Sequence, residues 1–409
     1  MHPKYLSITD FTYDLPKDRI AEKPVAQRDC SKLLIWEQGK IIEDIYKNIA
    51  DHLPEDSLLI FNDTKVIPAR IFFQKSTGAV IEIFCLEPYQ QDYTSVMSSK
   101  KPVRWKCLIG GAGKWKQGNL EKKIFLNQRQ IDLSAELIER LSDAYVVELT
   151  WNADEFSFAE VMEAAGEMPL PPYIKRKADS EDRERYQTIF AKEKGSVAAP
   201  TAALHFTPGI LASLTQKNIE TDFVTLHVGA GTFKPVKATL LEGHEMHAEW
   251  MDLSYKTIEH LKTNNQIIAV GTTSARTLES LYQMGAKLEI DTELSDEKLS
   301  VKQWEVYEEP LATFTISKEK ALENVLHRMK KNNSERLVTQ TQIIITPGYK
   351  FRMINSLITN FHQPQSTLLL LIAAAIGDKW KSVYNHALNN NFRFLSYGDG
   401  CLLNISQQS

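Results

Sequence analysis

Short apolar runs separated by polar turns occupy the first part of the chain and predict strands. The run at residues 58–61 leads directly into Asn-Asp-Thr, which is typical of a strand that ends in a polar turn. From about residue 69 to residue 151, short β-rich runs follow one another with almost no helical periodicity. This pattern predicts a small antiparallel barrel or sandwich. The runs are ARIFFQ, AVIEIFCLE, VRWKCLIG, KKIFLN and YVVELTW.

Beyond this β-rich stretch, predicted strands and helices alternate. Residues 157–160 (SFAE) form a capping-box pattern, and we expect the helix that they open to end at Gly166. The alternation that follows is typical of an α/β body. We therefore predict an α/β main domain, residues 1–67 and 152–409, with a small antiparallel β-barrel domain, residues 68–151, inserted into it. The later strands are predicted at 223–228, 267–270 and 392–397. A turn and helix are predicted at 271–285, and further helices at 364–377 and 380–388.

Composition narrows the class of protein. Of the 409 residues, 43% are hydrophobic and 24% are charged, which is ordinary for a globular protein and argues against disorder or a fibre. The four cysteines lie far apart, so we expect neither a disulfide framework nor a cysteine metal cluster, and a cytoplasmic setting fits best. The longest apolar run, residues 368–376, is too short to cross a membrane and predicts a buried helix.

Basic residues are concentrated in one part of an otherwise acidic chain. The formal net charge is −4, yet residues 100–129 hold nine lysines and arginines against one acid, Glu121. Trp105 and Trp115 lie among them. A basic stripe with aromatic residues favours binding of a nucleic-acid backbone with stacked bases, whereas the alternative is a solvated lysine face. A second basic set follows at residues 175–177, 183 and 185.

One predicted strand runs straight into the start of a helix. Residues 267–270 lead into Gly271 and then Thr-Thr-Ser, where free N–H groups attract anions, although the hydroxyls could equally be plain caps. Arg276 in the first turn is disfavoured by the helix dipole. We therefore expect Arg276 to have either an acidic partner or an anionic ligand.

Several familiar motifs are incomplete. The glycines of VTLHVGAGTF (224–233) allow close approach of a ligand, but the third glycine and the helix of a dinucleotide loop are missing. His227 in this stretch is either a site residue or a core histidine. His244 and His247 are three residues apart, so the zinc-protease motif is absent and no metal is predicted. No G-x-S-x-G elbow of a serine hydrolase is present.

The stretch 195–207, GSVAAPTAALHFT, combines very small residues with a titrating group. The run of Gly and Ala leaves room for a ligand close to the backbone. His205 stands at its end, and imidazole titrates near neutral pH. We therefore expect a ligand site here.

Ten stretches in a fixed order carry a family resemblance: FTYDLPKDRIAEKP, LLIFNDTKVIPAR, GEMPLPPYIKR, DRERYQTIFA, GSVAAPTAALHFT, VTLHVGAGTFKPV, HEMHAE, VGTTSARTLESL, TPGYKFRMINSLITNFHQPQSTLLLL and FRFLSYGD. Together they resemble the S-adenosylmethionine:tRNA ribosyltransferase-isomerase family of the queuosine pathway, from near residue 11 to near residue 400. That family has an α/β main domain with an inserted small β-barrel domain, which matches the interruption predicted above.

The resemblance implies an activity. The enzyme would transfer the ribosyl part of S-adenosylmethionine to the aminomethyl group of 7-aminomethyl-7-deazaguanine in a tRNA anticodon and isomerise it, giving epoxyqueuosine, adenine and methionine. It implies a monomer with no metal and no cofactor beyond the co-substrate S-adenosylmethionine. The chemistry needs a base, because the sulfonium acidifies the ribose C5′ hydrogens, and an acid for the departing adenine. The sulfonium itself favours carboxylate or aromatic faces.

These needs select candidate residues at positions that match the family. We predict His205 and His227 as the proton-transfer pair, without assigning acid and base between them. Asp63, Glu167 and Tyr173 are predicted for the sulfonium or the ribose, and Thr273, Ser274 and Arg276 for the methionine carboxylate. The further substrate-binding candidates are Gly195, Thr201, Gly229, Gly231, Asn360 and His362, and the tRNA-binding candidates are Arg104, Lys114, Lys116, Lys175, Arg176 and Arg185.

The chain departs from the family pattern at a few positions. Ala203 stands where the family usually has Gly, and Gln363 and Gln365 stand where it usually has Leu and Lys. Loss of that lysine could alter an anion contact. Two alternatives therefore stay open: a paralogous S-adenosylmethionine-dependent transferase with a different acceptor, and a non-catalytic RNA-binding protein. The role of the charged segment 289–336 is also left open, although its composition predicts a peripheral position.

Overall fold

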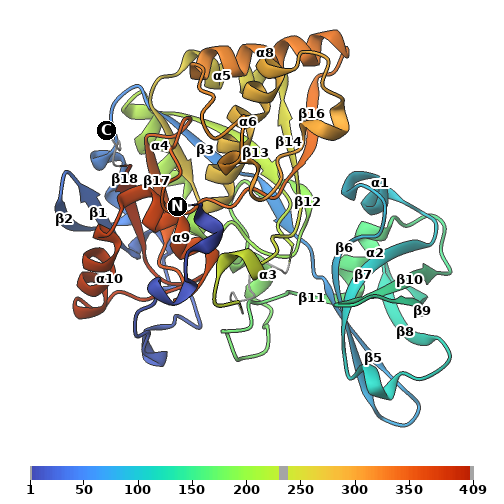
Figure 1. Cartoon of the computed structure of the whole chain (residues 1–409). Coiled ribbons are helices and arrows are strands. Elements are labelled where there is room, and N and C mark those ends of the chain that lie inside the picture. Colours follow the sequence, from blue (N-terminus) through green and yellow to red (C-terminus); the bar gives the residue numbers. More distant parts are fainter. Residues whose placement is uncertain (1, 230–237, 406–409) are drawn as a thin grey trace.

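A large mixed sheet, the main sheet, forms the centre of the computed structural model, which describes residues 2–229 and 238–405 (Figure 1). Within these residues its strand order is β16 (Arg336–Thr341), β14 (Glu249–Ser254), β13 (Glu220–Leu226), β3 (Leu58–Asn62), β15 (Ile267–Val270), β17 (Ser356–Asn360), β18 (Gly400–Asn404), β1 (Lys32–Glu37) and β2 (Lys40–Ile45). Strands β13, β3, β15 and β17 run parallel to one another. β14 and β18 continue the sheet in antiparallel pairing on either side of that parallel group.

Helices cover the main sheet, whose central strands are apolar on both faces. The helices packed around it are α4 (Pro208–Gln216), α5 (Tyr255–Thr263), α6 (Thr272–Ile290), α8 (Lys318–Lys331), α9 (Thr367–Ile376) and α10 (Lys379–Asn389). Two further helices, α3 (Asp182–Arg185) and α7 (Asp296–Leu299), are short. On β3, Leu58 and Ile60 join the core cluster that includes α6, whereas Leu59 and Phe61 join a cluster that includes α4. Alternate residues of a strand point to opposite faces, so β3 is packed from both sides.

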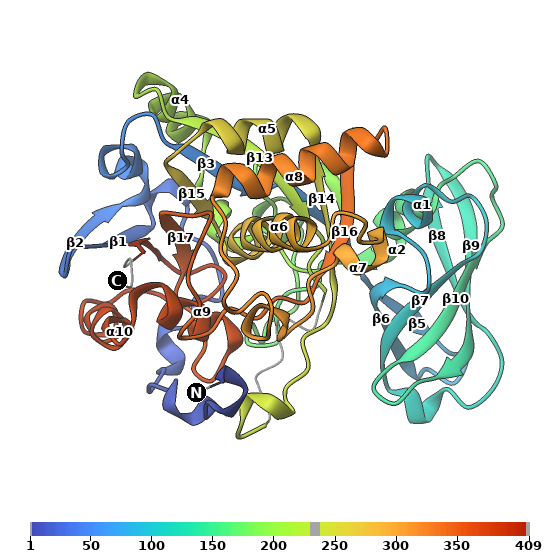
Figure 2. The ribbon, with the colours of Figure 1, turned by 45° about the horizontal axis from the view of Figure 1, so that its top comes forward.

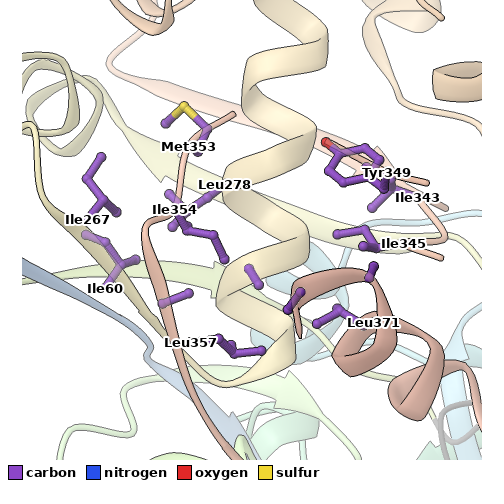
Figure 3. Close-up of a cluster of buried hydrophobic side chains, with 14 of the residues drawn as sticks. Ile60, Ile267, Leu278, Ile343, Ile345, Tyr349, Met353, Ile354, Leu357 and Leu371 are labelled. Carbon is purple, nitrogen blue, oxygen red and sulfur yellow. The ribbon is translucent and has the colours of Figure 1, made fainter. Parts of the chain in front are cut away.

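The core around α6 joins segments that are distant in the sequence (Figure 3). Leu278 of α6 belongs to the same cluster as Ile60 of β3 and Leu371 of α9. Burying each such side chain contributes roughly 1.5–3 kcal/mol. The position of α6, and with it the position of its first turn, is therefore set by packing against several elements.

Close contact between α6 and α8 depends on a glycine. A Cβ atom at Gly285 would lie 2.1 Å from the carbonyl oxygen of Ala321. Figure 2 shows α8 lying over α6 and beside α5. α8 belongs to the charged segment 289–336, and its apolar residues are buried, as Leu322 and Val325 illustrate. The segment thus forms an outer layer that still contributes to the core.

A second, curled antiparallel sheet, the module sheet, stands to one side of the main sheet in both views (Figures 1 and 2). Within the described residues its order is β11 (Gly166–Glu167), β5 (Arg70–Gln74), β6 (Val80–Pro88), β7 (Val103–Gly110), β10 (Tyr145–Trp151), β9 (Arg129–Arg140) and β8 (Leu120–Leu126). It encloses a hydrophobic cluster of its own, to which helices α1 (Tyr93–Ser98) and α2 (Phe158–Ala165) contribute. All five β-rich runs predicted from the sequence are strands of this sheet.

The capping box predicted at residues 157–160 is confirmed. The backbone N–H of Ser157 donates to the Glu160 carboxylate at 2.8 Å, and the reciprocal bond is also present. The helix ends at Gly166, as predicted. The apolar run 368–376 forms most of the buried helix α9. Among the described residues, no helix is long and apolar enough to cross a membrane.

The prediction of a strand at residues 392–397 is wrong. Phe392 and Phe394 are buried as an alternating pattern demands, but the backbone turns at Leu395, whose φ is 69°. Asp399 closes this turn, because its carboxylate accepts a hydrogen bond from the backbone N–H of Arg393 at 2.7 Å. The last strand of the main sheet is β18, a few residues later. The twelve-residue strand β9 and the helix α1 were not predicted.

Candidate active site

Polar side chains gather where the parallel strands of the main sheet end. Asp63 follows β3, His227 follows β13, Gly271 follows β15, and His362 stands two residues beyond β17. The carboxyl ends of parallel strands share one edge of a sheet, and ligands bind there where the strand order changes direction. β13 and β15 lie on opposite sides of β3, which is such a change. This edge is therefore the candidate active site.

A hollow of about 730 Å³, part of it open to solvent, lies at this edge and is called the first hollow. The small residues Ala198, Ala199 and Ala202 line it, so that a ligand could approach the backbone closely. The start of α6 and the end of β17 also contribute to its lining. A largely apolar hollow with a few converging polar groups is typical of a small-molecule site.

His205 is buried behind the wall of the first hollow. Its Nδ1 lies 3.3 Å from the carbonyl oxygen of Arg28, and its Nε2 lies 3.5 Å from the amide nitrogen of Asn360, which does line the hollow. Because a carbonyl oxygen only accepts, Nδ1 carries the hydrogen and Nε2 is the acceptor. Burial lowers the pKa of His205 to about 4. The imidazole is therefore uncharged at neutral pH.

His227 lies directly beyond β13 and lines a different hollow, the second hollow. Its Nδ1 is 3.1 Å from the hydroxyl oxygen of Thr64, and its ring lies against Tyr93, with the ring centroids 4.8 Å apart. A Cβ atom at Gly195 would lie 2.8 Å from the His227 ring, so Gly195 makes room for the histidine. Burial lowers the pKa of His227 to about 4.

The two histidines predicted as a proton-transfer pair do not share a cavity. His205 reaches the first hollow through Asn360, whereas His227 lines the second hollow. Val228, the residue after His227, lines the first hollow. A predicted acid and base that act on two groups of one ligand would therefore require that ligand to reach both hollows.

The start of α6 contributes one of the three residues predicted for a carboxylate. Thr273 lines the first hollow, and among the described residues its buried hydroxyl has no hydrogen-bond partner. Ser274 donates its hydroxyl hydrogen to the Val270 carbonyl at 2.9 Å. Arg276 forms an ion pair with Glu249, and both side chains are buried. Of the two expectations for Arg276, the structure shows the acidic partner. A buried guanidinium needs such a compensating charge.

Of the three residues predicted for the sulfonium or the ribose, Tyr173 lines the first hollow. Its hydroxyl lies 2.5 Å from that of Ser396, and burial raises its pKa to about 12. Asp63 accepts a hydrogen bond from the Thr225 hydroxyl at 2.7 Å, and burial raises its pKa. Glu167 is exposed on β11, where it lines an open groove instead of the first hollow.

Three further predicted residues lie together in the first hollow. Thr201 donates its hydroxyl hydrogen to the side-chain oxygen of Asn360 at 2.7 Å. His362 Nε2 lies 2.9 Å from the Thr359 hydroxyl, and burial lowers the pKa of His362 to about 3. These bonds hold the end of β17 in one arrangement.

The remaining positions singled out in the sequence are scattered. Gly229 lines the second hollow, and Gly231 lies outside the described residues. Of the departures from the family pattern, Gln363 lines the first hollow, and Gln365 has a positive φ of 55°. Ala203 is buried in the core cluster beneath the sheet. Gln363 is therefore the departure that a bound ligand could contact.

Acidic residues of neighbouring strands offset much of the basic stripe at residues 100–129. Arg104 pairs with Glu148 at 2.8 Å, and Lys106 lies within 3.9 Å of two carboxylates that are outside the stripe. Lys114 and Lys116 are exposed and form no ion pair with the described residues. The excess of basic residues in the sequence thus overstates the charge that the module sheet presents.

Two arginines of the second basic set also form bonds within the chain. Arg176 binds the Asp182 carboxylate through two nitrogens, at 2.6 and 2.8 Å. Arg185 donates to the backbone carbonyls of residues 25 and 26. Lys175 is exposed on the open groove.

The two tryptophans predicted to stack on bases are core residues, so that prediction is wrong. Trp105 is 0% exposed and Trp115 is 2% exposed. The indole N–H of Trp115 donates to the Gly118 carbonyl at 2.8 Å. Both belong to the hydrophobic cluster of the module sheet. Trp105 does so because alternate residues of β7 face inward.

Comparison with known proteins identifies the family. A family model described as queuosine biosynthesis protein matches residues 8–403. This chain belongs to that family. A relative from Halothermothrix orenii, named S-adenosylmethionine:tRNA ribosyltransferase-isomerase, is 35% identical over 406 residues, covering 97% of this chain and 100% of the relative. A relative of the same name from Magnetococcus marinus is 34% identical over 401 residues, covering 97% and 93%.

This chain is also similar to an S-adenosylmethionine tRNA ribosyltransferase from Thermotoga maritima whose crystal structure is known. The two sequences are 26% identical. The match covers 96% of this chain and 99% of the other, with a TM-score of 0.45. The family resemblance inferred from the sequence is confirmed by the family model and the two relatives.

Some residues at this edge were not singled out in the sequence. Ser396 lines the first hollow and a narrower one beside His205. Thr64 bonds to His227. Both residues lie within stretches that carry the resemblance to the queuosine biosynthesis protein family. Their place in these stretches is the sequence signal that could have identified them. Among the described residues, no group of three or more His, Cys, Asp and Glu is arranged to hold a metal.

Proposed function

We propose that this chain is an S-adenosylmethionine:tRNA ribosyltransferase-isomerase that acts on 7-aminomethyl-7-deazaguanine in tRNA. It would transfer and isomerise the ribosyl group to give epoxyqueuosine, with release of adenine and methionine. The observation that carries the proposal is the first hollow, where small residues, the start of α6 and the end of β17 meet at the carboxyl edge of the parallel strands. The names of its two relatives support the same activity.

S-adenosylmethionine occupies the first hollow in this proposal. Its methionine carboxylate lies at the start of α6, where backbone N–H groups and the helix dipole favour an anion. Thr273 offers a hydroxyl that has no hydrogen-bond partner among the described residues. The ring of Tyr173 lies in the same lining, and an aromatic face attracts a sulfonium.

The proton transfers of the reaction fall to imidazoles that are uncharged at neutral pH. His205 Nε2 can accept a proton from the substrate when the Asn360 amide, which donates a hydrogen bond to it and lines the hollow, is displaced from it. A neutral imidazole that removes a ribose C5′ hydrogen as a proton becomes an imidazolium, which is an acid of suitable strength for the departing adenine. No metal and no cofactor beyond S-adenosylmethionine enters this scheme.

The module sheet contacts the tRNA in this proposal. Residues 68–151 would form an inserted domain of barrel character, and residues 1–67 and 152–409 would form the catalytic domain. Lys114, Lys116 and Lys175 are exposed and can meet phosphate groups. We place the enzyme in the cytoplasm as a monomer.

Adenine release tests the proposal. The purified chain is incubated with S-adenosylmethionine and tRNA that carries 7-aminomethyl-7-deazaguanine, and both adenine and the modified nucleoside are measured by mass spectrometry. Epoxyqueuosine and adenine in equal amounts are expected. Adenine release with a different acceptor would identify the paralogous transferase, and RNA binding without adenine release would identify the non-catalytic alternative.

A further inference from the structure

The second hollow adjoins the first and shares a wall with it. It holds about 520 Å³ of space, part of it open to solvent. His227 and Gly229 line the second hollow, whereas Val228 between them lines the first. The hydroxyl of Ser196 holds this wall, since it accepts from the Val228 N–H at 2.9 Å and lies 3.2 Å from the Val228 carbonyl oxygen. Groups bound in the two hollows would therefore lie close together, on opposite sides of the backbone at residues 227–229.

The second hollow carries an excess of negative charge. Lys106 lies 3.5 Å from the Glu87 carboxylate and 3.9 Å from that of Asp143, and all three side chains line the hollow. Two carboxylates thus face one ammonium. The Glu87 side chain is 39% exposed and that of Asp143 is 50% exposed, so neither carboxylate is buried in the fold. A cationic ligand would gain a partner here, whereas a phosphate would meet repulsion.

Aromatic surface lies in the same hollow. Trp250 is half-buried and Tyr93 is buried, and both contribute to the lining. The Trp250 ring offers an apolar face on which a planar base can stack, whereas the Tyr93 ring lies against that of His227. The charged groups belong to the module sheet and its loops, and Trp250 belongs to the main sheet, so the hollow lies between the two sheets.

His227 is uncharged at neutral pH, because burial lowers its pKa to about 4, so it does not repel a cation. Its Nδ1 lies 3.1 Å from the Thr64 hydroxyl, which also lies 3.4 Å from the Glu193 carbonyl oxygen. Because a neutral imidazole has one donor and one acceptor nitrogen, the other ring nitrogen can form a hydrogen bond with a bound base.

We propose that the second hollow binds a planar purine-type base that bears a primary ammonium group. This inference rests on the proposed function and assigns the acceptor base to the second hollow, beside S-adenosylmethionine in the first. Before the transfer, Glu87 and Asp143 bind the ammonium, Trp250 stacks on the ring, and the free ring nitrogen of His227 forms a hydrogen bond with the base. The ammonium then passes a proton to one of the two carboxylates and leaves them, so that its free amine can attack the ribosyl carbon in the adjoining first hollow.

Binding of two RNA hairpins tests the inference independently of catalysis. The probes are an anticodon stem-loop that carries 7-aminomethyl-7-deazaguanine and the same stem-loop with guanine. The full-length double variant Glu87→Gln/Asp143→Asn is expected to weaken binding of the aminomethyl hairpin about 10-fold or more, because charge-assisted hydrogen bonds are lost. Binding of the guanine hairpin should change by less than about twofold, since its base carries no ammonium.

A variant that is expected to strengthen binding gives a second test. Lys106→Gln removes the competing cation, so it should tighten binding of the aminomethyl hairpin relative to the guanine hairpin. Glu121→Gln, at an exposed position of β8, is the matched control and should leave the binding of both hairpins unchanged. Thermal unfolding checks that each variant is folded.

Two results would overturn the assignment. One is an unchanged ratio between the hairpins in the Glu87→Gln/Asp143→Asn variant. The other is weaker binding of both hairpins by Lys106→Gln, which would indicate a phosphate in the hollow. If wild-type protein prefers the aminomethyl hairpin but releases no adenine, the proposed function fails while the assignment of the second hollow stands.

Discussion

The amide nitrogen of Asn360 lies 3.5 Å from Nε2 of His205, so one side chain joins a buried histidine to the wall of the first hollow. The other face of the histidine is held by Tyr46, whose ring is stacked on it with the centroids 4.1 Å apart. His205 is thus fixed in one orientation with its acceptor nitrogen directed to Asn360. A histidine held in this way is suited to a proton transfer at a fixed atom.

Replacement of His205 by Gln should lower adenine release about 100-fold, because the amide keeps hydrogen bonding but cannot take a proton. The measurement is adenine formation with saturating S-adenosylmethionine and precursor tRNA. His386→Gln is the control, since that histidine lies near the surface and pairs with Glu43 at 2.7 Å. Near wild-type turnover of the His205 variant would remove this residue from the chemistry.

Replacement of Thr273 by Val should raise the KM for S-adenosylmethionine roughly 5- to 10-fold, since one hydrogen bond to the ligand is lost. The free energy of unfolding should stay within about 1 kcal/mol, because the hydroxyl has no partner among the described residues. Thr277→Val is the matched control. Its hydroxyl donates to the Thr273 carbonyl at 3.0 Å, so the control should lose stability and keep its KM. Equal KM values in both variants would contradict a ligand at Thr273.

Replacement of Lys114 and Lys116 by Glu should weaken tRNA binding and reduce its dependence on salt. Each phosphate contact that is lost lowers the slope of log K against log salt by roughly 0.7–0.9. Binding isotherms at several salt concentrations measure this slope. Lys40→Glu/Lys47→Glu, on exposed residues of the main sheet's far edge and the segment after it, is the control for a change in net charge. The same slope in both double variants would exclude a specific role for Lys114 and Lys116.

His260 should stabilise the fold at mildly acidic pH. Burial by itself would lower its pKa, but hydrogen bonds and charge from Glu220 and Asp222 outweigh burial and raise it. The imidazole lies 2.6 Å from the Glu220 carboxylate and 2.9 Å from that of Asp222. Because the folded-state pKa is above the unfolded value of 6.5, the stabilisation is complete below pH 6.5 and is lost as pH rises through the folded-state pKa.

His260→Gln should therefore cost up to about 1 kcal/mol at pH 5.5 and little at pH 9, as measured by urea unfolding. Each value is compared with that of the wild-type chain at the same pH. A loss of stability that is equal at both pH values would mean that packing, and not charge, accounts for the effect of His260.

Replacement of Gly285 by Ala should destabilise the fold by about 1–3 kcal/mol, because the new methyl group would overlap the Ala321 carbonyl where α6 meets α8. Gly113→Ala is the control, since a methyl group at that position would meet open space beyond its chain neighbours. Denaturant unfolding measures both changes. A Gly285 variant as stable as the control would show that α8 can move away from α6 without cost.

Local features of the chain were predictable because they depend on neighbours in sequence. The capping box at residues 157–160, the strand at 267–270 and the buried helix at 368–376 each follow from the spacing of apolar and capping residues. Motif order over the whole chain indicated the family. The failed strand at 392–397 has the right alternation, but a turn closed by Asp399 decides its backbone.

The sequence by itself determined most of the predicted elements and the family, and the tertiary structure decided which side chains are available for chemistry. Arg276 of α6 was predicted to have either an acidic partner or an anionic ligand, and the partner that the structure shows, Glu249, comes from the distant strand β14. His205 is buried behind the wall of the first hollow, whereas His227 lines the second, although both lie in small-residue stretches. The physical reason is the same in each case: charge compensation and burial depend on distances between residues far apart in the chain, which local patterns do not contain.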